Sequence, residues 1–133
     1  MATGETNLNT LLKSMQPVLH EGIYVFHSSS ISFSDAIKFD PVLIFKEKEG
    51  TALILKKESA DQAGLEYQYP CRMITLNIHL SLEAVGFLAA ITRKLADANI
   101  SVNSVSAHFH DHLFIPEDRA LDAMNILNTF AIE

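Results

Sequence analysis

Cysteine and basic residues are both scarce in this 133-residue chain, which has one cysteine, Cys71, and no tryptophan. A single cysteine excludes an internal disulfide and a thiolate zinc cluster. Lysine and arginine number 10 against 16 aspartates and glutamates, for a net charge of −6. Because a protein that binds phosphate backbones needs a basic face, the charge balance argues against nucleic acid as a partner.

Long hydrophobic runs are also absent. The longest, Ala84 to Ile91, is far shorter than a membrane span, and no basic segment leads into an apolar stretch near Met1. We therefore expect no membrane association and a cytoplasmic location. With 48% hydrophobic and 20% charged residues, the composition is typical of a folded protein with one domain or two very small ones. It does not reveal an activity.

The first half of the chain predicts a helix, three strands and a second helix. Thr6 or Asn7 caps the first helix, Pro17 stops it, and Ser34 or Asp35 caps a helical turn after the first strand. A polar loop is expected at 28–30. The expected elements are a helix over 8–15, a strand over 23–26, a hairpin over 42–57 with its turn at Glu49-Gly50, and a helix over 59–65 that ends near Gly64.

The second half predicts a strand, a helix, two strands and a last helix. The strand over 73–80 alternates, with Ile74, Leu76, Ile78 and Leu80 on one face. The expected elements that follow are a helix over 88–98 with Asn99 as its left-handed cap, a strand over 100–109 with a bulge near 103–104, a turn at Asp111, a strand over 112–115, and a helix that Pro116 opens.

The two halves read as copies of one unit. A shift of 60 residues aligns Leu53 with Leu113 and Ala60 with Ala120, and the shared order of elements indicates a repeat. The second copy has no strand after its last helix, and the first has a stunted first helix. We therefore expect each half to borrow a sheet edge from the other, and we predict one domain over 1–69 and another over 70–133 that pack together.

The turn from Ser81 to Leu88 joins a strand to a helix and contains Gly86. The start of a helix presents unpaired backbone N–H groups, so a carboxylate can bind there without a cationic side chain. Gly86 would let a ligand approach closely. The alternatives are that Gly86 only relieves crowding between helix and strand, and that Ser81 is only a helix cap.

The residues His108, His110 and His112 raise the alternative of a metal-dependent enzyme. Alternate residues of a strand share a face, so His108 and His110 could converge. Catalytic zinc sites usually need a third protein ligand, and none is evident, so we predict no metal. Cys71 has no neighbouring histidine and is expected to be a structural thiol. No phosphate loop, dinucleotide fingerprint or G-x-S-x-G motif occurs, and we predict no catalytic residue and no cofactor.

Four segments resemble an ACT domain. They are the strand Ile74 to Leu80, the turn Glu83 to Leu88, the helix end Leu95 to Ser101, and the segment Asp111 to Pro116. The segments Gly4 to Leu12 and Gly22 to Phe26 are similar to those of small bacterial proteins built from two such units.

The resemblance implies an α+β, ferredoxin-like βαββαβ fold with an antiparallel sheet in each of two units. It also implies a non-catalytic regulatory protein that binds a small ligand, expected to be an amino acid, and that forms a homo-oligomer, expected to be a dimer. A regulated partner enzyme is not identified. The implied ligand-binding residues are Glu83, Ala84, Val85 and Gly86 in the turn, with Asn99, Ile100, Ser101 and Asn103 expected beside it. The alternative is a protein-interaction module that binds nothing small, with the apolar hairpin strands as its contact surface.

Overall fold

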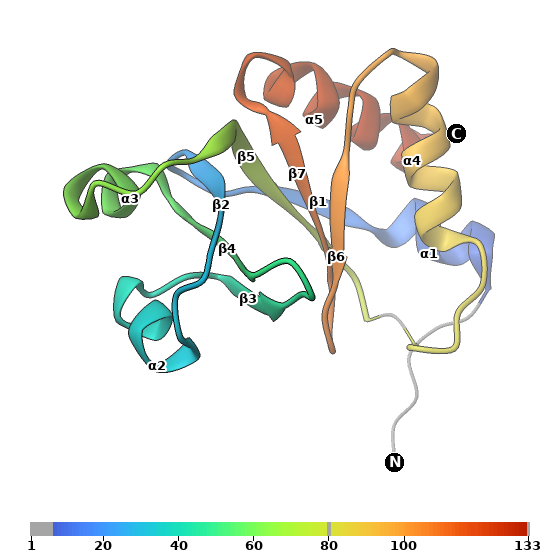
Figure 1. Ribbon diagram of the computed structural model, residues 1–133. Coiled ribbons are helices and arrows are strands. Elements are labelled where there is room, and N and C mark those ends of the chain that lie inside the picture. Colours follow the sequence, from blue (N-terminus) through green and yellow to red (C-terminus); the bar gives the residue numbers. More distant parts are fainter. Residues whose placement is uncertain (1–6, 80, 133) are drawn as a thin grey trace. The chain divides into compact units, whose positions relative to one another are not determined.

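The computed structural model describes residues 7–79 and 81–132, which group by contacts into two compact units (Figure 1). The unit that we call the terminal unit contains the residues up to His20 and those from Arg72 onward. The central unit contains Glu21–Cys71. Strand β5, Gln68–Asn77, begins in the central unit and ends in the terminal unit. The contacts therefore join the first twenty residues to the second half, whereas the predicted boundary places them in a domain over 1–69.

The terminal unit has an antiparallel sheet with the strand order β1-β5-β7-β6. Its other elements lie mostly after β5 in the sequence. They are α1 Leu8–Ser14, β1 Gln16–Leu19, α4 Phe87–Asp97, β6 Asn103–Ser106, β7 Asp111–Pro116, the 3-10 turns η2 Glu117–Arg119 and η3 Thr129–Ile132, and α5 Ala120–Asn128.

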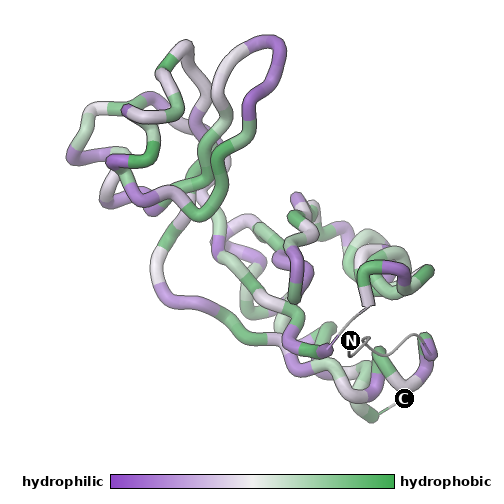
Figure 2. The backbone as a smooth tube through the Cα atoms, turned by 90° about the horizontal axis from the view of Figure 1, so that it is seen from below, coloured by the Kyte–Doolittle hydropathy of each residue, from purple (hydrophilic) through white to green (hydrophobic). Residues whose placement is uncertain are grey.

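Helices α1, α4 and α5 cover one face of this sheet (Figure 1). The core combines inward-facing strand residues with one apolar stripe from each helix, as amphipathic helices on a half-buried sheet require. Among its buried members are Leu11 of α1, Ile74 of β5, Ile91 of α4, Leu113 of β7 and Leu127 of α5. In Figure 2, several of the loops between helices and strands are purple, the colour of hydrophilic residues.

The central unit has a smaller sheet with the order β3-β4-β2 followed by the first part of β5. Its elements are β2 Tyr24–Ser29, α2 Phe33–Ala36, η1 Ile37–Phe39, β3 Leu43–Lys46, β4 Thr51–Lys56 and α3 Lys57–Ala63. Its core is formed by Val25, Leu53 and Leu55 from the strands, with Ala36 and Ala60 from the two helices.

Both units have the ferredoxin-like βαββαβ arrangement, in which the first strand lies between the third and the fourth. In the central unit, the first strand β2 lies between β4 and β5, and its first helix is only the four-residue α2. In the terminal unit, β5 lies between β7 and β1. The predicted antiparallel α+β fold is confirmed, and so is the stunted first helix.

Strand β1 supplies the sheet edge that the second half of the sequence lacks. It pairs with β5 from Gln16 opposite Asn77 to Leu19 opposite Ile74. Sequence analysis missed this strand because Pro17 reads as a helix stop, although proline is tolerated at a sheet edge. The helix already ends at Ser14, with Met15 extended behind it, so the role given to Pro17 is wrong.

Several local predictions hold for a clear physical reason. The side chain of Asn7 accepts a hydrogen bond from the N–H of Thr10 and so caps α1. Gly64 and Asn99 both have left-handed backbone at helix ends, with φ of 67° and 59°. The hairpin β3–β4 turns at Gly50.

Other local predictions are wrong. Ser32, rather than Ser34 or Asp35, caps α2 by accepting from the N–H of Asp35. The polar residues 28–29 belong to strand β2. Strand β6 begins only at Asn103, so no strand extends over 100–109 to contain a bulge. Asp111 begins β7 instead of occupying a turn.

Among the residues described, no helix has the length and the apolar character needed to cross a membrane. Two predictions concern residues outside the described ones: Leu80 was predicted to face inward, and Thr6 was considered as a helix cap.

Candidate functional site: a pocket at the start of helix α4

Gly86 is the N-cap residue of α4, and its backbone is left-handed, with φ 90° and ψ −10°. A Cβ placed on it would contact only the Cδ2 of Leu8, at 3.8 Å. Crowding therefore does not require glycine here. The positive φ does, because a residue with a side chain adopts it at a cost.

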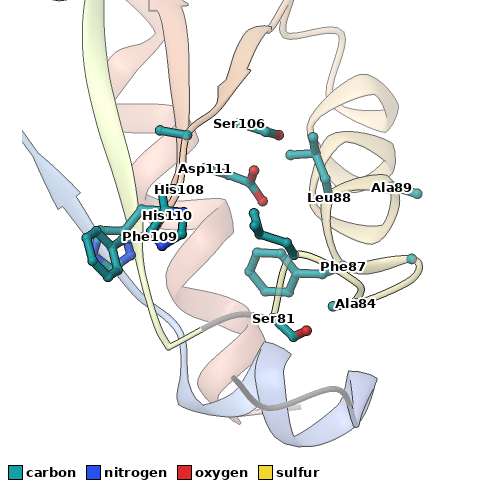
Figure 3. A pocket seen from close by; sticks show the side chains of 13 residues that line it. Ser81, Ala84, Phe87, Leu88, Ala89, Ser106, His108, Phe109, His110 and Asp111 are labelled. Atoms are coloured by element: carbon teal, nitrogen blue, oxygen red, sulfur yellow. The ribbon is translucent and has the colours of Figure 1, made fainter. Parts of the chain in front are cut away.

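A cavity of about 180 Å³ lies in front of this helix start, as Figure 3 shows. One wall is the turn and the first residues of α4, and the opposite wall is the end of hairpin β6–β7. The lining residues are Ser81, Leu82, Ala84, Gly86, Phe87, Leu88 and Ala89 on one side, and Ser106, Ala107, His108, Phe109, His110 and Asp111 on the other.

The first turn of α4 lacks a side-chain cap in the described part of the chain. The first backbone N–H groups of a helix have no partner within it and carry the positive end of its dipole. Within the turn, by contrast, two amides are already used. Ser81 accepts from Glu83 N–H through its hydroxyl and from Ala84 N–H through its carbonyl. The N–H groups of Phe87, Leu88 and Ala89, in the first turn of α4, are therefore the ones that we consider for a ligand.

The predicted turn residues contribute unequally to this pocket. Ala84 and Gly86 line it. Glu83 and Val85 are both exposed, Val85 to 85%, and neither is among its lining residues. Ser81, considered as a cap of α4, organises the turn instead.

Asn99, Ile100, Ser101 and Asn103 were expected beside the glycine turn, and the structure does not place them in the pocket lining. These residues follow the opposite end of the eleven-residue helix α4, and none of them lines the pocket. Ile100 is buried in the core. The carbonyls of Ala98 and Asn99 accept hydrogen bonds from Arg119, at 3.3 and 3.4 Å. A cation at a helix C-terminus is the stabilising placement, so this end has a structural role.

Asp111 is the charged residue of the pocket that sequence reasoning missed. It pairs with Ser106 across the hairpin and shares a face of β7 with Leu113 and Ile115, which pack in the helix-covered core. Figure 3 shows its carboxylate directed from β7 toward the first turn of α4. An acidic residue in the inward phase of an apolar strand was the signal that could have found it.

A histidine–threonine–histidine chain lies elsewhere in the terminal unit. The hydroxyl of Thr75 is 2.7 Å from His20 Nε2 and 2.8 Å from His112 Nδ1. Burial lowers the pKa of His112, and the nearby His110 and His20 lower it further, against an opposing effect of Asp111. His112 is thus favoured in its neutral form.

His108 and His110 do not lie on the strand from which their convergence on one face was argued. His108 and His110 lie in the turn between β6 and β7, closed by a hydrogen bond from Ala107 N–H to the carbonyl of His110. Across residues 7–79 and 81–132, no group of three or more histidine, cysteine or acidic side chains is arranged to hold a metal ion. Cys71 is buried, and its thiol donates to the carbonyl of Tyr24.

The chain was compared with models of known protein families. Two ACT-domain models match the chain, one over residues 3–72 and the other over 66–129. The chain belongs to the ACT-domain family. No curated protein sequence matches the chain. The ACT domain is a regulatory module, and membership in the family supports a regulatory, ligand-binding role.

Solved structures agree with this ACT-domain assignment. A protein of unknown function from Vibrio cholerae, described as a possible transport protein, is 42% identical, with a TM-score of 0.87 over 93% of this chain and 95% of its own. The regulatory subunit of aspartate kinase from Thermus flavus has a TM-score of 0.66 at 13% identity, over 88% of this chain and 97% of its own. A putative C-terminal regulatory domain of aspartate kinase from Porphyromonas gingivalis has a TM-score of 0.59 at 12% identity, over 91% and 99%. The last two show the shared fold.

Proposed function

We propose that this ACT-domain protein is a non-catalytic sensor that binds a small amino acid in the pocket at the start of α4. The observation that carries the proposal is the uncapped first turn of α4 facing a cavity. The carboxylate of an amino acid fits such a helix start. The cavity, at about 180 Å³, is smaller than the roughly 300–1,000 Å³ of pockets for drug-sized ligands, which favours a small metabolite.

Exposed apolar side chains around the pocket favour association of the chain with another protein surface. Leu82 and Phe109 line the pocket and are 71% and 68% exposed. Large apolar groups gathered at a site are typical of an interface. We therefore propose a homodimer as the state that the ligand stabilises, because a ligand shifts an equilibrium only by its differential affinity for the two states. A regulated enzyme is the expected further partner.

A thermal-shift screen of the wild-type protein against the twenty amino acids tests the sensor. At 100 times the dissociation constant, a ligand that binds only the folded state adds about 2.7 kcal/mol of stability. Ser106→Phe places a large side chain at the pocket wall and should abolish the response. Ser104→Phe is the matched control, since Ser104 is also exposed on β6 but does not line the pocket. No response to any amino acid would overturn the proposal.

The alternative, an interaction module without a small ligand, is favoured by one feature of the central unit. Phe33, Ile37, Val42 and Phe45 are each about half exposed or more. If the screen gives no response and Phe45→Lys abolishes oligomer formation in sedimentation, the interaction module is the better description. A response that Ser106→Phe removes favours the sensor.

A further inference from the structure

Asp111 is a buried acid without an internal partner. Its side chain belongs to a residue that is only 6% exposed, and among the described residues no hydrogen bond or ion pair holds its carboxylate. A charge taken out of water is costly unless it is paired or hydrogen-bonded. The Asp111 oxygens are not among the side-chain atoms that are both sealed from solvent and unpartnered, so they open to the pocket; among the described residues, Nδ1 of the neighbouring His110 is such an atom. Both residues line the same pocket.

The missing partner of Asp111 is a cation that comes from the ligand. The described residues that line the pocket include no lysine or arginine, so they supply no ammonium or guanidinium there. A stable metal site usually has three or more protein ligands, and the described residues contain no group of three or more histidine, cysteine or acidic side chains arranged to hold an ion. A single carboxylate suits an ammonium group, which donates charge-assisted hydrogen bonds.

The two walls of the pocket carry opposite electrostatic preferences. The first turn of α4 favours a carboxylate, whereas the Asp111 carboxylate on the facing strand favours an ammonium and repels a second anion. Figure 3 shows the Asp111 oxygens and the first residues of α4 facing each other. A simple carboxylic acid would satisfy the helix and leave Asp111 unpaired, while a molecule with both groups on one carbon satisfies both.

We infer that Asp111 is the ammonium-binding residue of this pocket and selects α-amino acids against acids that lack the amino group. The inference rests on the proposed function, since it assigns a specificity residue within the same site. A purely structural role is the competing account. In it, the acid stabilises the positive end of the α4 dipole.

The two accounts differ for Asp111→Asn, which keeps the shape and removes the charge. If Asp111 serves the helix, the variant melts at a lower temperature than wild type. If Asp111 instead binds a ligand, the ligand-free variant is as stable as wild type or more so, because the carboxylate has no hydrogen bond or ion pair to lose within the described chain. Asp118→Asn is the matched control, since Asp118 is exposed and outside the pocket.

Titration calorimetry with matched pairs of ligands completes the test. The amino acids are glycine, alanine, serine, threonine, valine, leucine and aspartate. Their partners without the amino group are acetate, propionate, 3-hydroxypropionate, 3-hydroxybutanoate, isovalerate, 4-methylpentanoate and succinate. We expect the amino acid that binds wild type to exceed its partner by about tenfold or more in affinity, and to lose about tenfold or more in Asp111→Asn but not in Asp118→Asn.

Any of the following results would overturn the inference. Equal affinity of the amino acid and its partner acid, or unchanged affinity in Asp111→Asn, would remove the role of Asp111 while the sensor stands. A lower melting temperature of ligand-free Asp111→Asn with unchanged affinity would assign Asp111 to the helix. If none of the seven pairs binds wild type, the inference falls, and the sensor itself fails only if the full set of twenty amino acids also gives no thermal response.

Discussion

The hydroxyl of Thr75 lies 2.8 Å from Nδ1 of His112, and His20 Nε2 approaches the same hydroxyl to 2.7 Å. A hydroxyl has one proton to donate, so Thr75 donates to one imidazole and accepts from the other. With burial and two neighbouring histidines opposing its charge, His112 has a pKa below the ordinary value of 6.5. This chain makes the stability of the terminal unit depend on pH.

We expect the free energy of unfolding to fall as the pH is lowered below about 6.5. In that range the unfolded chain binds a proton at His112 while the folded protein does not, so stability rises with pH. His112→Asn keeps a polar group near the Nδ1 position and should flatten the dependence. Urea unfolding between pH 5 and 8 measures it. His79→Asn, at an exposed position, should retain the wild-type slope, and an unchanged slope in His112→Asn would contradict the prediction.

Gly86 should tolerate asparagine better than alanine. At φ 90° a Cβ costs about 1–2 kcal/mol, and asparagine is more often found in this conformation than alanine. The added Cβ meets only ordinary contact with Leu8, so the loss is conformational. We expect urea unfolding to give wild type, Asn and Ala in descending stability. Gly22, with φ 89° and open space around it, should give the same order; equal stability of Gly86→Asn and Gly86→Ala would exclude this account.

Arg119→Ala should destabilise the protein by about 1 kcal/mol without changing its response to amino acids. It removes two hydrogen bonds to carbonyls at the end of α4, and a cation at that end is stabilising. Thermal melting with and without ligand measures both quantities. Arg93→Ala breaks an exposed pair with Asp97 and should change stability by less than about 0.5 kcal/mol. A lost ligand response in Arg119→Ala would place this end of α4 in the site after all.

A chain of residues 70–133 should not fold by itself. It lacks α1 and β1, so the core loses Leu11 and Met15 and the edge of β5 beside β1 is left unpaired. A peptide of residues 7–20 added in solution should restore the fold, since it supplies both elements. Amide chemical-shift dispersion in NMR spectra reports the outcome. Full dispersion without the peptide would show that the segment is dispensable.

Sequence reasoning recovered the elements that local chemistry determines. Gly64 and Asn99 identify helix ends because few residues adopt left-handed backbone. The glycine turn before α4 lines a cavity, whereas ligand binding there stays a prediction. The 60-residue shift agrees with the structure, because Leu53 lies on β4 and Leu113 lies on β7, the corresponding strands of the two units.

What sequence reasoning missed depends on contacts between distant segments. Strand β1 was not predicted because Pro17 was interpreted as a helix stop, and the partner of β1, strand β5, lies more than fifty residues later. Asn99 follows Gly86 by one helix length, so adjacency in the motif did not mean adjacency in space. Asp111 resembles a turn residue by composition, although it shares the inward phase of Leu113 and Ile115, and its pairing with Ser106 places it in the strand.

Strand β1 also has a consequence for biosynthesis. Residues 16–19 leave the ribosome long before their partners at 74–77, and the core that encloses Leu11 is finished only by residues 113–130. Domains tend to fold from the N-terminus as they emerge, but here the first segment must wait for the last one. The terminal unit therefore has a high contact order, and its folding on the nascent chain is delayed until residues 113–130 have been synthesised.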